Sequence, residues 1–169
     1  MIVPNVFGPF VENHPKPTSR ADLITDDFIY ELVLEHNGEY PQNPHSSMAD
    51  VRDIAKAVGL PIPSHLCTQT YLYHLPQHVL SLTSPPSKEN KRLLICSKFF
   101  KWKEVAELIR EKRPELAHRL PRKDAIPPVR MSAPYDLSLT EKVIGLKEYI
   151  PWEDTILASI DEGLKLEQK

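Results

Sequence analysis

The stretch SSMADVRDIAKA, residues 46–57, couples an extended segment directly to the start of a helix. Asp50 precedes the first turn, where its carboxylate can accept hydrogen bonds from N–H groups that lack a partner inside the helix. Asp53 falls within that turn, where the helix dipole favours a negative charge. We expect Arg52 and Asp53 to form a salt bridge or a cap rather than to touch a ligand. The stretch therefore predicts a strand that passes straight into a helix, as in α/β proteins.

The predicted helix does not continue as its start suggests. Residues 58–77 follow it and contain Pro61 and Pro63, each of which costs about 3 kcal/mol inside a helix. Without that segment, DVRDIAKA would join HVLSLTSPP, residues 78–86, and the apolar positions of the two halves would share one helical face. These positions are Val51, Ala55, Val79 and Leu82.

The genetic code suggests an origin for residues 58–77. Val58 and Gly59 are encoded by GTN and GGN, and Gln77 by CAA or CAG, so the segment can begin with GT and end with CAG, as introns do. An insertion is tolerated far better in a surface loop than within a buried helix. We therefore expect residues 58–77 to be a translated intron, with a genuine inserted loop as the alternative.

Apolar spacing and turn residues predict the remaining elements. A short strand in MIVPNVF, residues 1–7, ends at Gly8 and Pro9. Apolar residues at helical spacing after Ser19 predict one amphipathic helix that stops at Asn37 and Gly38. KRLLIC, residues 91–96, predicts a buried strand. The apolar residues of the first helix are Leu23, Ile24, Phe28, Ile29 and Leu32, and further helices are expected within residues 101–116, 137–146 and 151–166.

Composition excludes several classes of protein. The chain has 169 residues, 41% hydrophobic and 26% charged, which fits one globular domain. Its net charge of -2 provides no basic face for nucleic acid or for an anionic membrane. No apolar run approaches the roughly 20 residues that span a bilayer, and the first residues lack a cationic signal region. We therefore expect a cytoplasmic protein with neither a nucleic-acid nor a membrane partner.

The sequence gives little support to a metal site or a disulfide. Cys67 and Cys96 lie far apart without a CxxC motif. Histidines around Cys67 supply further soft ligands, but Pro76 prevents two of them from sharing a helical face, and most of the group lies within residues 58–77. We therefore expect no metal at this group, which consists of His65, Cys67, His74 and His78.

Five stretches in order resemble the C-terminal half of an extended short-chain dehydrogenase/reductase. They are VPNVFGPF, DVRDIAKA with HVLSLTSPP, KRLLIC, WKEVAELIREKRPEL and LTEKVIGLKEYIPWEDTILASIDEGL. The branch they resemble contains dihydroflavonol reductases, cinnamoyl-CoA reductases and fungal aldehyde or ketone reductases. The resemblance implies an α/β fold over residues 1–169: a partial Rossmann-like, doubly wound sheet edge with a small α+β substrate-binding lobe. The chain departs from the pattern at Val3, where members often have proline.

The resemblance implies reduction of an aldehyde or ketone by hydride from NADP or NAD. Such enzymes hold the pyrophosphate in a glycine-rich turn and use a Tyr-x-x-x-Lys pair for proton transfer. No tyrosine of this chain has lysine four residues on, and its glycines are scattered: Gly8, Gly38, Gly59, Gly145 and Gly163. We therefore expect a chain that starts too late to hold this machinery, contains no catalytic residue and binds dinucleotide weakly. The alternative is a non-catalytic module that pairs with a full-length relative.

The first strand is where the resemblance implies remaining site residues. By resemblance, Pro4, Asn5 and Val6 lie beside the cofactor, partly through their backbone. Phe7 and Phe10 are the implied wall of the pocket for a small carbonyl substrate. A structural interpretation stays open, in which Val6 and Phe7 belong to the core and Gly8 with Pro9 forms an ordinary turn.

Overall fold

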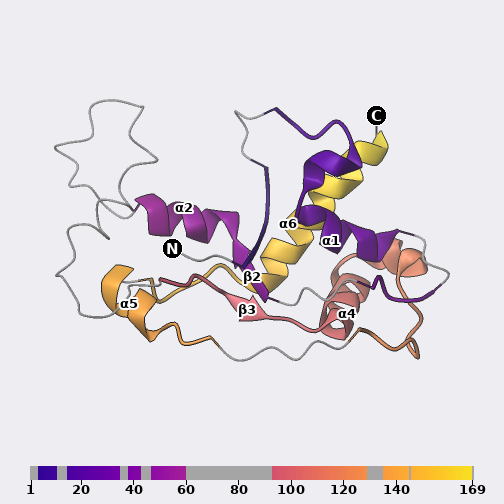
Figure 1. The fold of residues 1–169 in the computed structure, drawn as a ribbon. Coiled ribbons are helices and arrows are strands. Elements are labelled where there is room, and N and C mark those ends of the chain that lie inside the picture. The colour runs from indigo at the N-terminus through magenta and orange to yellow at the C-terminus, as the bar shows by residue number, and fades with distance from the viewer. Residues whose placement is uncertain are drawn as a thin grey trace.

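A computed structural model shows how these segments are arranged (Figure 1). It describes residues 4–10, 15–34, 38–42, 47–59, 93–128, 135–144 and 146–168. Most of residues 58–77 lie outside this part of the chain, as do residues 78–86 and the group formed by His65, Cys67, His74 and His78. Only Val58 and Gly59 of the suspected intron are included, as the last residues of a helix.

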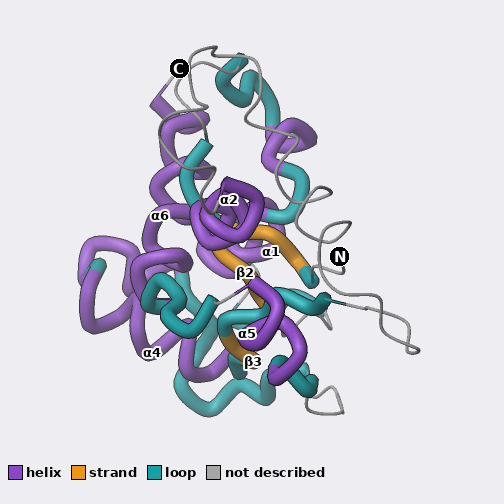
Figure 2. The backbone as a smooth tube through the Cα atoms, turned by 90° about the vertical axis from the view of Figure 1, so that its left-hand side faces the viewer, coloured by secondary structure: helices purple, strands orange, loops and turns teal. Residues whose placement is uncertain are grey.

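A small mixed sheet lies at the centre, with β2 as its middle strand (Figure 2). Strand β1, Asn5–Phe7, pairs in parallel with β2, Ser47–Asp50, and places Phe7 opposite Asp50. Strand β3, Lys98–Phe99, pairs antiparallel with β2. A parallel pair flanked by helices confirms the expected α/β class.

Four predicted helices form near their expected positions. Helix α2, Val51–Gly59, follows β2 without a loop, as the opening stretch predicts. Helix α4, Trp102–Lys112, buries one apolar face, and helix α5, Ser138–Ile144, follows. Helix α6, Trp152–Leu164, begins directly after Pro151. The described residues also form the 3₁₀ helices η1 Arg20–Leu23, η2 Glu31–Val33, η4 Pro114–Arg119 and η5 Lys165–Gln168.

The prediction of a single helix after Ser19 is wrong, because the helical conformation is interrupted at Ile24. The break separates η1 from α1, Asp26–Tyr30, and Ile24 adopts φ 54°. The carboxylate of Asp22 accepts hydrogen bonds from the backbone N–H groups of Thr18 and Ser19 at 2.9 and 2.8 Å. Such local bonds compete with a continuous helix. They close a short turn and leave Ile24 73% exposed instead of on an apolar face.

The strand expected in KRLLIC, residues 91–96, is displaced, since the ladder with β2 forms only at β3. Leu93, Ile95 and Cys96 are buried as expected. The N–H of Leu94 donates to Thr140 Oγ1 at 2.9 Å, and that hydroxyl donates to the Leu94 carbonyl at 2.7 Å. A side chain of α5 thus bonds both backbone groups of Leu94, which forms an isolated β-bridge and not a longer ladder.

The core lies between the sheet and the helices α1, α4 and α6. Phe100 packs edge-on against Phe7 and Trp102, with ring centroids 6.3 and 5.3 Å apart. Helix α6 approaches α1 closely at Gly163, where a Cβ atom would lie 2.3 Å from Tyr30 Cδ2. Only glycine fits there, so this contact sets the distance between the two helices.

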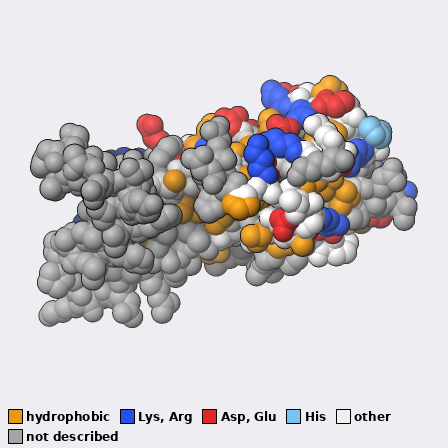
Figure 3. Space-filling view, turned by 90° about the horizontal axis from the view of Figure 1, so that it is seen from above, with side chains coloured by type: hydrophobic (Ala, Val, Ile, Leu, Met, Phe, Trp, Pro, Cys, Tyr) orange, Lys and Arg blue, Asp and Glu red, His pale blue; other side chains and the backbone are white. Residues whose placement is uncertain are grey.

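The described surface carries interspersed charges. On the face in Figure 3, acidic and basic side chains alternate, and apolar side chains lie between them. Among the described residues, no helix is long and apolar enough to cross a membrane. The same residues contain no cluster of three or more His, Cys, Asp or Glu side chains suited to a metal ion.

Candidate functional site

The candidate site lies where the parallel strands β1 and β2 end together, at Phe7 and Asp50. Ligands of open α/β sheets bind at the carboxyl ends of strands. Gly8 directly follows strand β1 and has φ +124°. A Cβ atom there would lie 3.2 Å from Val51 Cγ1 and 3.3 Å from Asp50 Oδ2. The turn therefore requires glycine for its conformation and for the close approach of β2.

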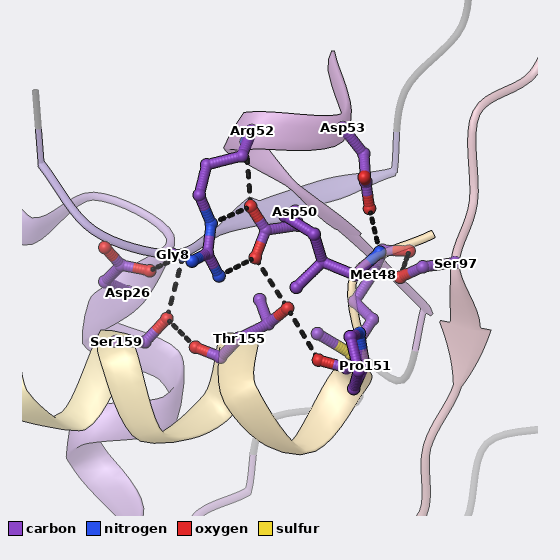
Figure 4. Close-up of polar contacts among 11 residues, drawn as sticks. Gly8, Asp26, Met48, Asp50, Arg52, Asp53, Ser97, Pro151, Thr155 and Ser159 are labelled. Atoms are coloured by element: carbon purple, nitrogen blue, oxygen red, sulfur yellow. Dashed lines mark hydrogen bonds and ion pairs between the residues drawn. The ribbon is translucent and has the colours of Figure 1, made fainter. Parts of the chain in front are cut away.

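Asp50 is fully buried and holds the start of α2 in place (Figure 4). Its Oδ1 accepts hydrogen bonds from the backbone N–H of Arg52 at 2.7 Å and from Arg52 Nε at 2.9 Å. Its Oδ2 accepts from Arg52 Nη2 at 2.8 Å and from Thr155 Oγ1 at 2.6 Å. Burial alone raises the pKa of Asp50, but the bonds from Arg52 and Thr155 hold that pKa below its usual value. The carboxylate is therefore an ionised structural anchor.

Arg52 and Asp53 occupy structural positions, as expected. Arg52 forms its salt bridge with Asp50. Asp53 is fully buried, and its Oδ2 accepts the backbone N–H of Ile150 at 2.9 Å. This bond ties α2 to the segment that leads into α6.

A second polar group surrounds the turn at Gly8. The N–H of Gly8 is shared between Ser159 Oγ, at 2.9 Å, and Asp26 Oδ1, at 3.2 Å. Ser159 Oγ donates in turn to the carbonyl of Thr155 at 3.1 Å. Figure 4 shows these groups converging on the turn from α6 and α1. The end of β1 is thus held by side chains from two other elements.

Asp26 is the unusual ionisable group of this site. It is 5% exposed. Burial raises its pKa to about 7, although hydrogen bonds with Ser159 and Gly8 act in the opposite direction. The negative charges of Glu162 and Asp50 raise the pKa further. Asp26 therefore carries a proton through the acidic range and loses it near neutral pH.

A largely apolar cavity of about 520 Å³ opens beside this turn. Val6, Phe7 and Phe10 contribute to its wall, so three of the five site residues implied by the resemblance line one pocket. Pro4 and Asn5 are not among its lining residues, and Asn5 Nδ2 donates to the Ser47 carbonyl at 3.1 Å. Phe7 is only 1% exposed and is mainly a core residue. The remaining lining residues are Gly8, Pro9, Pro15, Leu23, Ile24, Thr25, Asp26 and Val51.

Sequence reasoning missed the side chains that organise this site. Asp26 comes directly after Thr25 and resembles any charge in the first turn of a helix. Thr155 and Ser159 are spaced one helical turn apart on α6, which is the only signal that they share a face. Their partners, Gly8 and Asp50, lie more than 100 residues away, so no local pattern could identify the group.

The comparisons with known proteins concern the fold. No protein-family model matches the sequence, and no curated protein matches it. Yeast methylglyoxal/isovaleraldehyde reductase Gre2, solved in complex with NADPH, aligns with a TM-score of 0.60 and 20% identity over 98% of this chain and 42% of that chain. Gre2 from Candida albicans aligns with a TM-score of 0.59 and 20% identity over 96% of this chain and 42% of that chain. A reductase engineered to attenuate substrate inhibition in asymmetric catalysis aligns with a TM-score of 0.52 and 20% identity over 96% of this chain and 42% of that chain.

The alignments cover very different shares of this chain and of the reductases. Nearly the whole of this chain is covered, yet it spans less than half the length of the reductases it matches. At this level of identity the likeness concerns the fold, and it agrees with the resemblance found in the sequence. The chain therefore shares its fold with a part of each of these reductases.

Proposed function

We propose that this chain forms the substrate-pocket side of an NAD(P)-dependent carbonyl reductase and does not complete the reaction alone. The observation that carries the proposal is the apolar cavity at the end of β1, in a fold shared with reductases. One of those structures is named as an aldehyde reductase bound to NADPH. A small, mainly apolar aldehyde or ketone suits a wall made of aromatic, aliphatic and proline side chains.

In this proposal the residues of β1 divide into two roles. Pro4, Asn5 and Val6 lie beside the nicotinamide, and Phe7 and Phe10 shape the wall that holds the carbonyl compound. The cofactor, when bound, supplies hydride to the carbonyl carbon. The chain's own contribution is to position the substrate and to exclude water from it.

The N-terminus of α2 does not suit the pyrophosphate of the cofactor. A dinucleotide pyrophosphate needs a helix N-terminus with free N–H groups and a glycine-rich approach. At the N-terminus of α2, the carboxylate of Asp50 already accepts the Arg52 N–H, and the buried Asp53 adds a second acidic group. Both acidic groups oppose a phosphate. The cradle for the pyrophosphate must therefore come from residues other than these.

The proposal predicts how the purified chain responds to cofactor. Titration with NADPH is expected to leave the nucleotide fluorescence unchanged through the micromolar range, and isovaleraldehyde is expected to remain unreduced. Yeast Gre2 measured under the same conditions is the positive control. Micromolar NADPH binding together with aldehyde reduction by this chain alone would refute the proposal.

We also propose that residues 58–77 are a translated intron, which the sequence pattern supports. Sequencing of transcripts across these codons is expected to find a spliced message that lacks them. A protein without residues 58–77 is expected to gain helical signal in circular dichroism and to melt at a higher temperature, because Pro61 and Pro63 no longer interrupt the helix. Retention of the segment in every message would identify it as a genuine insertion.

A further inference from the structure

We infer that the cavity beside the end of β1 binds a small apolar chain that carries a cationic amine, with the carboxylate of Asp26 as its counter-ion. The inference deepens the proposed function and rests on it for the reaction alone: the favoured substrates would be aldehydes or ketones that carry an amino group. Binding of the amine needs no cofactor, so it can be tested separately from reduction.

Asp26 is the one ionisable side chain in the described wall of this cavity. Thr25 also lines the cavity, but its hydroxyl already donates to the Val6 carbonyl. The rest of the described wall consists of aliphatic, aromatic, proline and glycine residues. An apolar pocket with one polar group favours a ligand of the same makeup, because the wall holds the chain and the polar group fixes its orientation.

One carboxylate oxygen of Asp26 is not used by the turn at Gly8. The Oδ1 atom accepts the N–H of Gly8 at 3.2 Å. In Figure 4 the other oxygen points away from Gly8 and from Ser159. Since Asp26 is 5% exposed and lines the cavity, this oxygen is placed to accept a hydrogen bond from a donor inside it.

Asp26 has no cationic partner among the described residues. Arg52 is held by Asp50, whose two carboxylate oxygens accept from its Nε and Nη2 at 2.9 and 2.8 Å. The charges that act on Asp26 from α6 and β2, those of Glu162 and Asp50, are negative. Buried carboxylates are normally paired with a positive charge. An ammonium group in the cavity would supply the charge that the described residues do not.

The titration of Asp26 predicts how binding depends on pH. Burial, with smaller contributions from Glu162 and Asp50, raises the pKa of Asp26 to about 7. An aliphatic amine stays cationic up to about pH 10, as the lysine side chain does, so only Asp26 changes its charge between pH 6 and 8. The ionised fraction of Asp26 rises from about one tenth to about nine tenths over this range. Binding of the amine should therefore strengthen about ten-fold.

NMR titration of the purified full-length chain tests the inference with isopentylamine and isopentyl alcohol, two probes with the same carbon skeleton. Chemical-shift changes give the Kd of each probe at pH 6 and at pH 8. We expect the amine to bind about ten-fold more tightly at pH 8 than at pH 6, whereas the Kd of the alcohol should not change.

The carboxyl carbon resonance of Asp26 gives a second, direct measurement. Its titration reports the pKa of Asp26 with and without a probe. Isopentylamine at about ten times its Kd should lower this pKa by about one pH unit, because the ammonium stabilises the ionised carboxylate. The alcohol should leave the pKa unchanged. A purely structural role of Asp26 would not produce this difference between the probes.

Asp26→Asn is the disruptive variant, because its amide oxygen can still accept the N–H of Gly8 but the side chain carries no charge. Asp27→Asn is the matched control: Asp27 is the next residue of α1, pairs with Arg20 and does not line the cavity. We expect Asp26→Asn to weaken amine binding at pH 8 about ten-fold and to abolish its pH dependence. Asp27→Asn should leave both unchanged, and the alcohol should still bind to both variants.

The outcomes separate this site from the proposed function. Equal and pH-independent binding of the two probes would overturn the inference, as would amine binding that survives Asp26→Asn or a lack of binding by either probe. If the chain alone binds NADPH and reduces isovaleraldehyde, the proposed function fails while an amine site that depends on Asp26 still stands. If the amine site is absent and NADPH has no effect, the inference fails and the proposed function stands.

Discussion

The stability of the protein is expected to fall as pH rises from 4 to 8, and Asp26→Asn is expected to remove most of that fall. The pKa of Asp26 is raised from 3.8 to about 7 in the folded protein. Between these values the folded state holds a proton that the unfolded state has released, so stability is greatest at the acidic end and falls as pH rises through 7. The full shift corresponds to at most about 4 kcal/mol. Asparagine keeps the shape of the side chain but does not titrate.

Urea denaturation at several pH values, monitored by tryptophan fluorescence, measures the free energy of unfolding of the parent protein and of Asp26→Asn. The effect of Asp26 is the difference between these two free energies at each pH. Other groups titrate equally in both and cancel in that difference. Asp22→Asn is the matched control, because Asp22 is exposed and its pKa, lowered to about 2 by bonds from Thr18 and Ser19, lies below the range. Asp22→Asn should therefore change the free energy of unfolding by the same amount at every pH between 5 and 8. Parallel pH profiles for the parent and Asp26→Asn would contradict the assignment.

Asp50→Ala is expected to destabilise the fold by about 3 kcal/mol at neutral pH. Removing one partner of a buried ion pair typically costs about 3–5 kcal/mol, and we expect the lower value because the Arg52 side chain is 42% exposed and can recover water. The hydroxyl of Thr155 loses its shorter hydrogen bond as well and keeps only the Pro151 carbonyl as an acceptor, at 3.3 Å. Since small domains have only about 5–15 kcal/mol of stability, the urea midpoint should fall sharply.

Two further variants test whether the ion pair is the cause. Asp50→Asn keeps an oxygen for Thr155 Oγ1 and should lose less than Asp50→Ala. Combining Asp50→Ala with Arg52→Met removes both charges, so the double variant should be more stable than the sum of the single effects predicts. Additive losses, or an Asp50→Ala change below about 1 kcal/mol, would show that the network is not the anchor described above.

Local sequence predicted those elements whose causes lie within a few residues. The junction of β2 and α2 follows from Asp50 at the helix start, and α4 and α6 follow from apolar spacing and a flanking proline. The break at Ile24 was missed, because apolar spacing indicates which residues can share a face but not whether Asp22 closes a turn first. The lack of a ladder with β2 at residues 93–96 was missed, because the Thr140 hydroxyl that bonds the Leu94 backbone lies 46 residues away.

The sequence by itself determined the α/β class, the resemblance to a reductase and the lack of a Tyr-x-x-x-Lys pair, since these depend on residue types and short spacings. Only the tertiary structure decided which side chains meet at the end of β1. Gly8 contacts Asp26 and Ser159 across 18 and 151 residues, and Asp50 contacts Thr155 across 105. The raised pKa of Asp26 arises from burial among these groups. Burial is a property of packing between distant segments, so no local pattern contains it.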